Sequence, residues 1–227
     1  MDESVWNSSF IKYRTDERVS HLVFVKWRGG SDALVFVYGK NPDQKNRDRT
    51  NPDQKNRDET NPDQKNRDRT NPDAVWVPVL KCNGYVGKCG LKADKKESDC
   101  ATPIGDFGIL TAFGIRENPG TKLDWLDVTE DLWCPDCDGP DYNKIVSTKN
   151  GGMPAGEHLI DFSPQYDYAL FLDYNKECIP QAGSAIFFHC TGPKKYTGGC
   201  IAVSEENMKD ILGILEKDDR VIIEPDQ

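Results

Sequence analysis

A decapeptide repeat at residues 41–73 limits where this chain can build a folded core. Residues 41–50 read NPDQKNRDRT, two further copies follow with a single change, and a fourth copy stops after its third residue. The unit has no aliphatic or aromatic side chain, so it cannot bury an apolar face to offset its ordering entropy. Solenoid repeats need such positions to stack. We therefore expect a disordered loop insertion; the alternative is a surface tether or ligand-binding arm.

The apolar segments outside the repeat predict a mainly β domain. They are short, rich in β-branched and aromatic residues, and bounded by Gly, Pro, Asn and Asp, as strands usually are. Asn83-Gly84 is a strong turn signal. Residues 1–20 are polar with scattered aromatic residues, and we expect a loosely held arm there. The expected strands span residues 21–27, 33–38, 74–82, 106–113, 166–174, 184–190 and 220–223.

One clear helix is expected near the C-terminus. Ser204 is a typical N-cap, and two glutamates follow in the first turn, where the helix dipole favours negative charge. Met208, Ile211, Leu212 and Leu215 then recur at the spacing of one buried helical face. Residues 114–157 are rich in Gly, Pro, Asp and Asn and predict a long irregular segment, which can act as a lid over a cleft.

Charge and hydropathy exclude some function classes. The formal charge is −9 and the sequence pI about 4.9, which disfavours partners such as nucleic acid or an anionic membrane surface. No apolar run is long enough to span a membrane. No signal peptide is evident after the acidic start at residues 1–4. A mature start, another export route and a cytosolic protein therefore all stay open.

Eight cysteines are many for a cytosolic enzyme. If one of them is a free catalytic thiol, the other seven cannot all pair within the chain. Cys134-Pro-Asp-Cys137 has the spacing of a redox motif, but Gly and Pro follow it where a helix should begin, so a local disulfide clip is favoured. A zinc site would need a second such pair. We expect no metal and no cofactor.

The stretch from His189 to Cys200 carries the best candidate chemistry. An apolar run ends at His189, a loop of Gly, Pro and Lys follows, and Thr-Gly-Gly-Cys leads into another apolar run. A thiol nucleophile needs a nearby base and backbone N–H groups for the developing oxyanion. The two side chains can meet across a hairpin, and Gly198 and Gly199 allow a close approach. A buried structural cysteine and a hydrogen-bonded structural histidine are the alternative.

Three segments in order resemble the L,D-transpeptidase catalytic domain family (YkuD-like). Residues 197–200 resemble its active-site motif in the branch that replaces the motif histidine with a small residue. Residues 97–107 are similar to its Gly-Asp-x-x-Thr-Pro-x-Gly-x-Phe segment, with Ser98 for the first Gly. Residues 182–189 match the strand that delivers the base. The resemblance implies one domain over residues 21–223, interrupted at 41–73, with a twisted sheet or sandwich curled around a cleft.

The same resemblance implies roles for individual residues. Cys200 is the nucleophile and His189 the base, whose second ring nitrogen is held by the carbonyl of Cys190. The N–H groups of Gly199 and Cys200 are the oxyanion donors. The remaining cleft candidates are residues that shape backbone or face the substrate, with His158 also a rival base that is more simply structural: Thr197, Gly198, Thr102, Gly105 and His158.

The implied function is that of a cell-wall cysteine acyltransferase, an L,D-transpeptidase. It forms a thioester on peptidoglycan stem peptides and passes the acyl group to an amine. An L,D-carboxypeptidase, with water as acceptor, and a silent cell-wall-binding module are the alternatives, because Gly198 and Ala202 replace side chains present in much of the family. A thiol-redox or zinc protein is a further alternative. We expect a monomer in the cell wall, periplasm or medium.

Overall fold

The computed structural model describes residues 4–40, 76–151 and 155–226. The repeat at 41–73 lies outside these residues. Within them, no helix is both long and apolar enough to cross a membrane.

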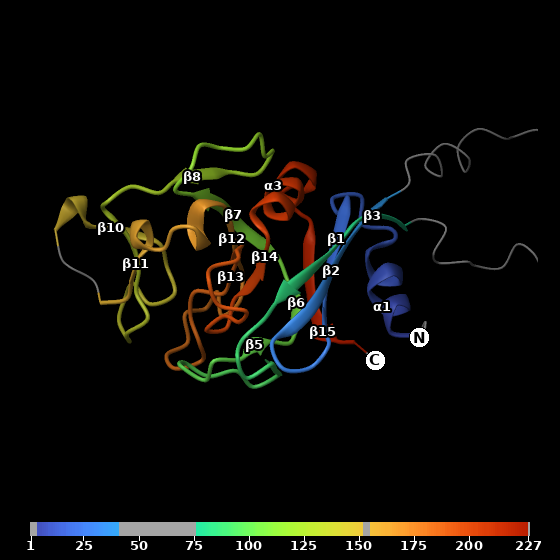
Figure 1. Cartoon of the computed structure of the whole chain (residues 1–227), viewed down its shortest axis with the longest axis horizontal. Coiled ribbons are helices and arrows are strands. Elements are labelled where there is room, and N and C mark those ends of the chain that lie inside the picture. Colours follow the sequence, from blue (N-terminus) through green and yellow to red (C-terminus); the bar gives the residue numbers. More distant parts are fainter. Residues whose placement is uncertain (1–3, 41–75, 152–154, 227) are drawn as a thin grey trace, which may run out of the picture.

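A ten-stranded sheet forms the body of the described residues and curls strongly (Figure 1). The β1–β2–β3 part is an antiparallel meander, whereas β15 pairs with β1, β14 with β13 and β8 with β7 in parallel. The predicted mainly β class is confirmed. In sheet order the strands are β6 (Gly105–Phe107), β15 (Arg220–Pro225), β1 (His21–Trp27), β2 (Asp32–Lys40), β3 (Trp76–Tyr85), β14 (Ile201–Val203), β13 (Phe187–Cys190), β12 (Ala169–Leu172), β7 (Ile109–Gly114) and β8 (Trp125–Asp127).

Short elements fill the segments between these strands. The expected lid region contains a three-stranded sheet in the order β10–β9–β11, and β4 pairs with β5 in parallel. Figure 1 shows β10 and β11 at the end of the molecule away from β1. The bounds are β4 (Leu91–Lys92), β5 (Thr102–Pro103), β9 (Leu132–Cys134), β10 (Val146–Ser147), η3 (Thr148–Asn150), β11 (Glu157–His158), η4 (Leu159–Asp161) and η5 (Gln165–Asp167).

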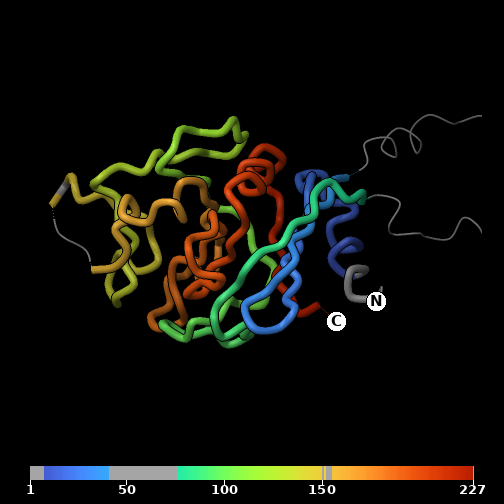
Figure 2. Tube along the Cα trace, viewed as in Figure 1, coloured from blue at the N-terminus to red at the C-terminus, as the bar shows by residue number. Residues whose placement is uncertain are grey.

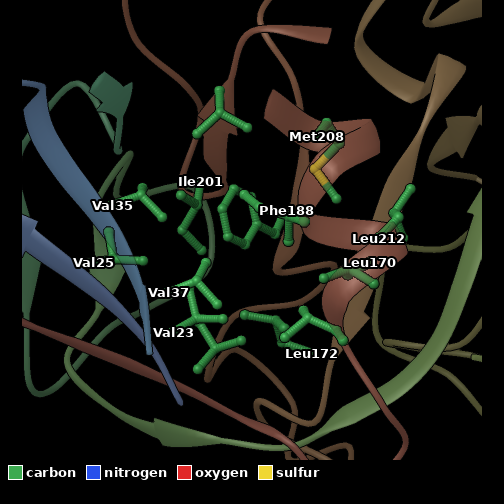
Figure 3. Close-up of a cluster of buried hydrophobic side chains, with 14 of the residues drawn as sticks. Val23, Val25, Val35, Val37, Leu170, Leu172, Phe188, Ile201, Met208 and Leu212 are labelled. Carbon is green, nitrogen blue, oxygen red and sulfur yellow. The ribbon is translucent and has the colours of Figure 1, made fainter. Parts of the chain in front are cut away.

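The main core lies between two facing parts of the curled sheet (Figure 3). Alternate residues of β1 and β2 point into the core from one part, and apolar residues of β12, β13, β14 and the C-terminal helix enter it from the other. This arrangement follows from the period of two along a strand, which gives each strand one core-facing set. The labelled core residues are Val23, Val25, Val35, Val37, Leu170, Leu172, Phe188, Ile201, Met208 and Leu212.

The C-terminal helix α3 (Glu205–Ile214) matches the prediction. The hydroxyl of Ser204 accepts a hydrogen bond from the N–H of Asn207, as an N-cap does. The predicted apolar face is completely buried from Met208 through Leu215. Packing of this face against β13 fixes the strand that carries the candidate base.

The N-terminal segment differs from the loose arm that we expected. Residues 4–13 form helix α1 (Ser4–Tyr13), and the ring of Phe10 packs against Phe24 and Trp76, at centroid distances of 5.2 and 5.9 Å. The outer face of β1 is therefore covered as well, because its residues alternate between this cluster and the main core. Figure 2 shows α1 beside the strands, close to the C-terminus of the chain.

Asn83-Gly84 is not a turn. Strand β3 continues through it and pairs with β2 up to Tyr85. A Cβ on Gly84 would lie 3.0 Å from the carbonyl oxygen of Ala202 in β14. The glycine thus permits close approach of the next strand, and that long-range contact overrides the local turn preference.

Candidate active site

Strands β13 and β14 place the candidate base and nucleophile on one face of the sheet. They pair in parallel, with Phe188 opposite Ile201 and His189 opposite Ala202. The hairpin that we expected is therefore wrong: residues 191–200 cross over to start β14 in the same direction as β13. Since neighbours opposite each other share a face, Phe187, His189 and Cys200 lie on the side away from the main core.

Both side chains line one cavity of about 430 Å³. Its walls come from the crossover after β13, the loop before β5, and the segment that contains β9, β11 and η5. The lid region expected at residues 114–157 thus contributes Cys134, Asp136 and Glu157 to the cavity. A substrate in this space can meet the thiol and the imidazole together.

Cys200 is held as a thiol. Its Sγ lies 3.2 Å from the carbonyl oxygen of Ala185 and 3.4 Å from the N–H of Phe187. Burial raises the pKa of Cys200 to about 12 and the nearby Glu157 carboxylate adds to the rise, whereas the Phe187 N–H and Lys95 oppose it. The resting group at neutral pH is therefore a protonated thiol, which needs a base before it can attack.

The imidazole of His189 keeps one ring nitrogen as a hydrogen-bond acceptor. Its side chain is buried, and Nδ1 lies 2.8 Å from the carbonyl oxygen of Cys190. A carbonyl only accepts hydrogen bonds, so Nδ1 carries the hydrogen and Nε2 keeps its lone pair. Burial lowers the pKa of His189 to about 4. The ring of Tyr166 packs edge-on against it, 5.5 Å between centroids, and fixes the imidazole plane.

Two threonines fix the backbone at the candidate nucleophile. The hydroxyls of Thr102 and Thr197 donate to the carbonyl oxygen of Cys200 at 3.1 and 2.7 Å. Thr102 is completely buried and also accepts the N–H of Gly87 at 2.8 Å. Thr102 therefore supports the candidate nucleophile by holding its backbone, and Thr102 itself does not line the cavity.

The two expected oxyanion donors differ in availability. The N–H of Gly199 donates to the hydroxyl of Thr197 at 3.2 Å. Among the described residues, no group accepts the N–H of Cys200. Gly199 has φ +153°, and a Cβ there would lie 3.0 Å from the carbonyl oxygen of Ala101, so only glycine fits without strain. Cys200 thus offers the free backbone donor.

The other predicted cleft residues divide into two groups. Thr197 and Gly198 line the cavity, and the Cβ position of Gly198 faces open space. Gly105 lies in β6, paired with Ile223 in β15, outside the cavity lining.

His158 also lies outside the cavity lining. Its Nδ1 is 2.9 Å from a carboxylate oxygen of Asp161, and its Nε2 is 2.7 Å from the carbonyl oxygen of Glu130. The ring stacks on Trp133 at 4.4 Å between centroids. With both nitrogens engaged, His158 holds the lid segment together and is not placed as a rival base.

Sequence reasoning missed three cavity residues. The hydroxyl of Tyr166 donates to a carboxylate oxygen of Glu157 at 2.5 Å, and burial is the main cause of the raised pKa of Glu157. Lys95 is buried against Gly199. All three lie in segments that the sequence marks as loop or strand edge, and nothing in the local pattern shows that they converge.

The cysteines form no disulfide in this structure. All eight are free, and the clip expected between Cys134 and Cys137 is absent because Cys134 is buried in the core at the end of β9 whereas Cys137 is exposed. Among the described residues, no cluster of three or more His, Cys, Asp or Glu side chains is arranged to hold a metal ion.

The comparison with known proteins agrees with this geometry. The family model of the L,D-transpeptidase catalytic domain, YkuD, matches residues 82–223. No curated protein and no solved structure matches the chain. The match covers more than half of the chain, from within β3 into β15, and is shorter than the expected span because β1 and β2 lie outside it. Members of this family act on peptidoglycan, typically in the cell wall or periplasm. The chain therefore belongs to the L,D-transpeptidase catalytic domain family.

Proposed function

We propose that this protein is a cysteine acyltransferase that forms a thioester on peptidoglycan stem peptides and transfers it to an amine. The observation that carries the proposal is the shared cavity of Cys200 and His189, in which Nδ1 is fixed by the carbonyl of Cys190 and Nε2 is left as an acceptor. A histidine held in this tautomer can act as a general base without a carboxylate partner.

The acylation step uses the neutral thiol of Cys200 and the neutral imidazole of His189. Cys200 Sγ attacks the carbonyl carbon of the third stem residue while its proton passes to Nε2 of His189. The Cys200 N–H donates to the oxygen on which negative charge develops. The C–N bond then breaks, and the leaving D-amino acid takes the proton from His189. Because the resting thiol and imidazole are both neutral, the resting pair is not an ion pair, and the proton has still to move from sulfur to Nε2 when the substrate is bound.

The second step consumes the thioester. An acceptor amine gives a proton to Nε2 of His189 and attacks the acyl carbon. The C–S bond breaks, and the thiolate recovers the proton. Acidic side chains of Asp136 and Glu157 line the same cavity and favour the approach of a cationic amine over a neutral acceptor. The ammonium gives its extra proton to solvent, and the neutral amine that results is the nucleophile. Water in place of the amine gives the carboxypeptidase product.

Product analysis tests the proposal. A tetrapeptide stem is incubated with the protein, and the released D-amino acid, the tripeptide and the cross-linked dimer are quantified by mass spectrometry. We expect release and dimer with the parent chain, and a loss of about 10³-fold or more with Cys200→Ala. Cys137→Ala, which removes an exposed thiol, is the matched control. Full activity of Cys200→Ala contradicts the assignment, and tripeptide without dimer identifies a carboxypeptidase.

A further inference from the structure

A buried lysine lines the cavity beside the nucleophile. Lys95 is 7% exposed, and its Nζ donates to the Asp99 carboxylate at 3.0 Å and to the carbonyl oxygen of Lys96 at 3.2 Å. An ammonium group has three donors, and no described residue accepts the third. A buried ammonium with an unused donor is costly unless an anion completes it. This position therefore calls for a negatively charged ligand group.

The charges around Lys95 leave a net positive end in the cavity. Asp99 is shared with a second lysine, Lys92, at 3.4 Å, and it also accepts the N–H groups of Lys96 and Ala101. Two ammonium groups therefore face one carboxylate. The cluster retains about one positive charge, and the buried part of it is the Lys95 ammonium.

The other charged groups that line the cavity do not cancel this charge at close range. Among the described residues, Lys95 forms an ion pair with Asp99 and with none of the lining carboxylates Glu97, Asp136 and Glu157. Glu97 and Glu157 accept hydrogen bonds from the hydroxyls of Tyr142 and Tyr166 instead. Lys194, the second lining cation, is exposed. Lys95 is thus the buried cation among the described lining residues.

Lys95 also lies against the residue before the nucleophile. A Cβ on Gly199 would be 3.3 Å from Lys95 Nζ, so the ammonium packs on the backbone that leads into Cys200. The N–H of Cys200 is free on the same segment. An anion bound by Lys95 therefore lies close to the bond that Cys200 attacks.

We propose that Lys95 recognises the free terminal carboxylate of the donor stem peptide, and so selects donors that end at the leaving residue. This inference rests on the proposed function. The carboxylate of a terminal amino acid is one carbon away from the scissile amide nitrogen, so it must lie next to the nucleophile in any productive complex. A longer or amidated peptide has no charge at that point and leaves the third donor of Lys95 unpaired.

Binding to Cys200→Ala tests this inference without turnover. Calorimetry compares a tetrapeptide stem that ends in a carboxylate with the same peptide ending in a carboxamide. We expect the acid to bind about 10- to 100-fold more tightly, which is the range for one charge-assisted hydrogen bond. Adding Lys95→Met removes this preference and changes carboxamide affinity less than about threefold. Adding Lys96→Met, at the exposed neighbouring lysine, preserves the preference.

The same measurements can overturn the inference. Equal affinity for acid and carboxamide in Cys200→Ala does so even if Lys95→Met fails to fold. An equal loss of affinity for both peptides in a folded Lys95→Met variant does so as well. Such a loss would mean that Lys95 contacts the reacting carbonyl or only supports the fold. A carboxylate preference that persists in a folded Lys95→Met variant overturns the inference too. A preference that Lys95→Met removes, with no release of D-amino acid by the parent chain, supports Lys95 recognition and refutes the proposed chemistry.

Discussion

Replacing Thr102 by Val tests the claim that the Thr-Pro segment holds the nucleophile through its backbone. Thr102 is completely buried, accepts the Gly87 N–H at 2.8 Å and donates to the Cys200 carbonyl at 3.1 Å. Valine has nearly the same shape, so the change removes a hydroxyl and leaves little cavity. The Cys200 carbonyl keeps one donor, Thr197, whereas the Gly87 N–H loses the acceptor recorded for it.

The expected cost follows from these two contacts. An orphaned buried N–H costs about 1–3 kcal/mol, and the lost donor to the carbonyl adds about 1 kcal/mol. The free energy of unfolding should therefore fall by about 2–4 kcal/mol. For a chain of this size that corresponds to a fall in Tm of roughly 5–15 °C.

Urea unfolding with linear extrapolation measures this cost, provided that the slope with denaturant is unchanged. Thr129→Val is the matched control, because the Thr129 hydroxyl is exposed and donates to Asp131. The control should change the free energy of unfolding by less than about 0.5 kcal/mol. A Thr102→Val variant as stable as this control would refute the reasoning.

Three further predictions concern titration. The rate at which iodoacetamide alkylates Cys200, followed by peptide mapping, should rise about tenfold per pH unit through pH 9, because burial is the main cause that raises the pKa of this thiol to about 12. A rate that levels off near pH 8 would contradict this. Acylation should fall about tenfold per pH unit below pH 4, because burial lowers the pKa of His189 to about 4; a midpoint near 6.5 in the pH–rate profile would contradict it. Burial opposes ionisation of Asp99, yet N–H donors and Lys95 lower its pKa from 3.8 to about 2, so its ionised form stabilises the fold above pH 4 and that contribution disappears as pH falls toward 2. Asp99→Asn should therefore cost about 2 kcal/mol at pH 7 and much less at pH 2.5 in urea unfolding, and an equal cost at both values would count against the ion pair.

Local patterns in the sequence predicted the parts of the fold that depend on local physics. The spacing from Met208 to Leu215 and the cap at Ser204 define α3, because helix faces and caps are set within a few residues. The strands expected at residues 21–27, 33–38 and 74–82 from their β-branched runs correspond to β1, β2 and β3. The features that differ are tertiary: α1 forms where Phe10 finds a buried site, and Gly84 serves the approach of β14.

In the candidate site, too, some features follow from local sequence and others only from tertiary contacts. His189 and Cys200 stand in one short stretch, so a motif shows them, although the parallel pairing that aligns them required the structure. Lys95, Glu157 and Tyr166 come from separate loops and converge only in the folded chain. Their significance lies in burial and in charge, which local sequence does not encode.

The most direct test of the central claim is the intact mass of the protein after incubation with a carbapenem. The strained β-lactam carbonyl of a carbapenem acylates an activated thiol, and because the ring opens, the whole compound stays attached to the protein. The account predicts one adduct on the parent chain, mapped to Cys200, and none on Cys200→Ala. Equal labelling of the parent chain and the variant, or no adduct on the parent chain, would contradict an activated Cys200 in the cavity that it shares with His189.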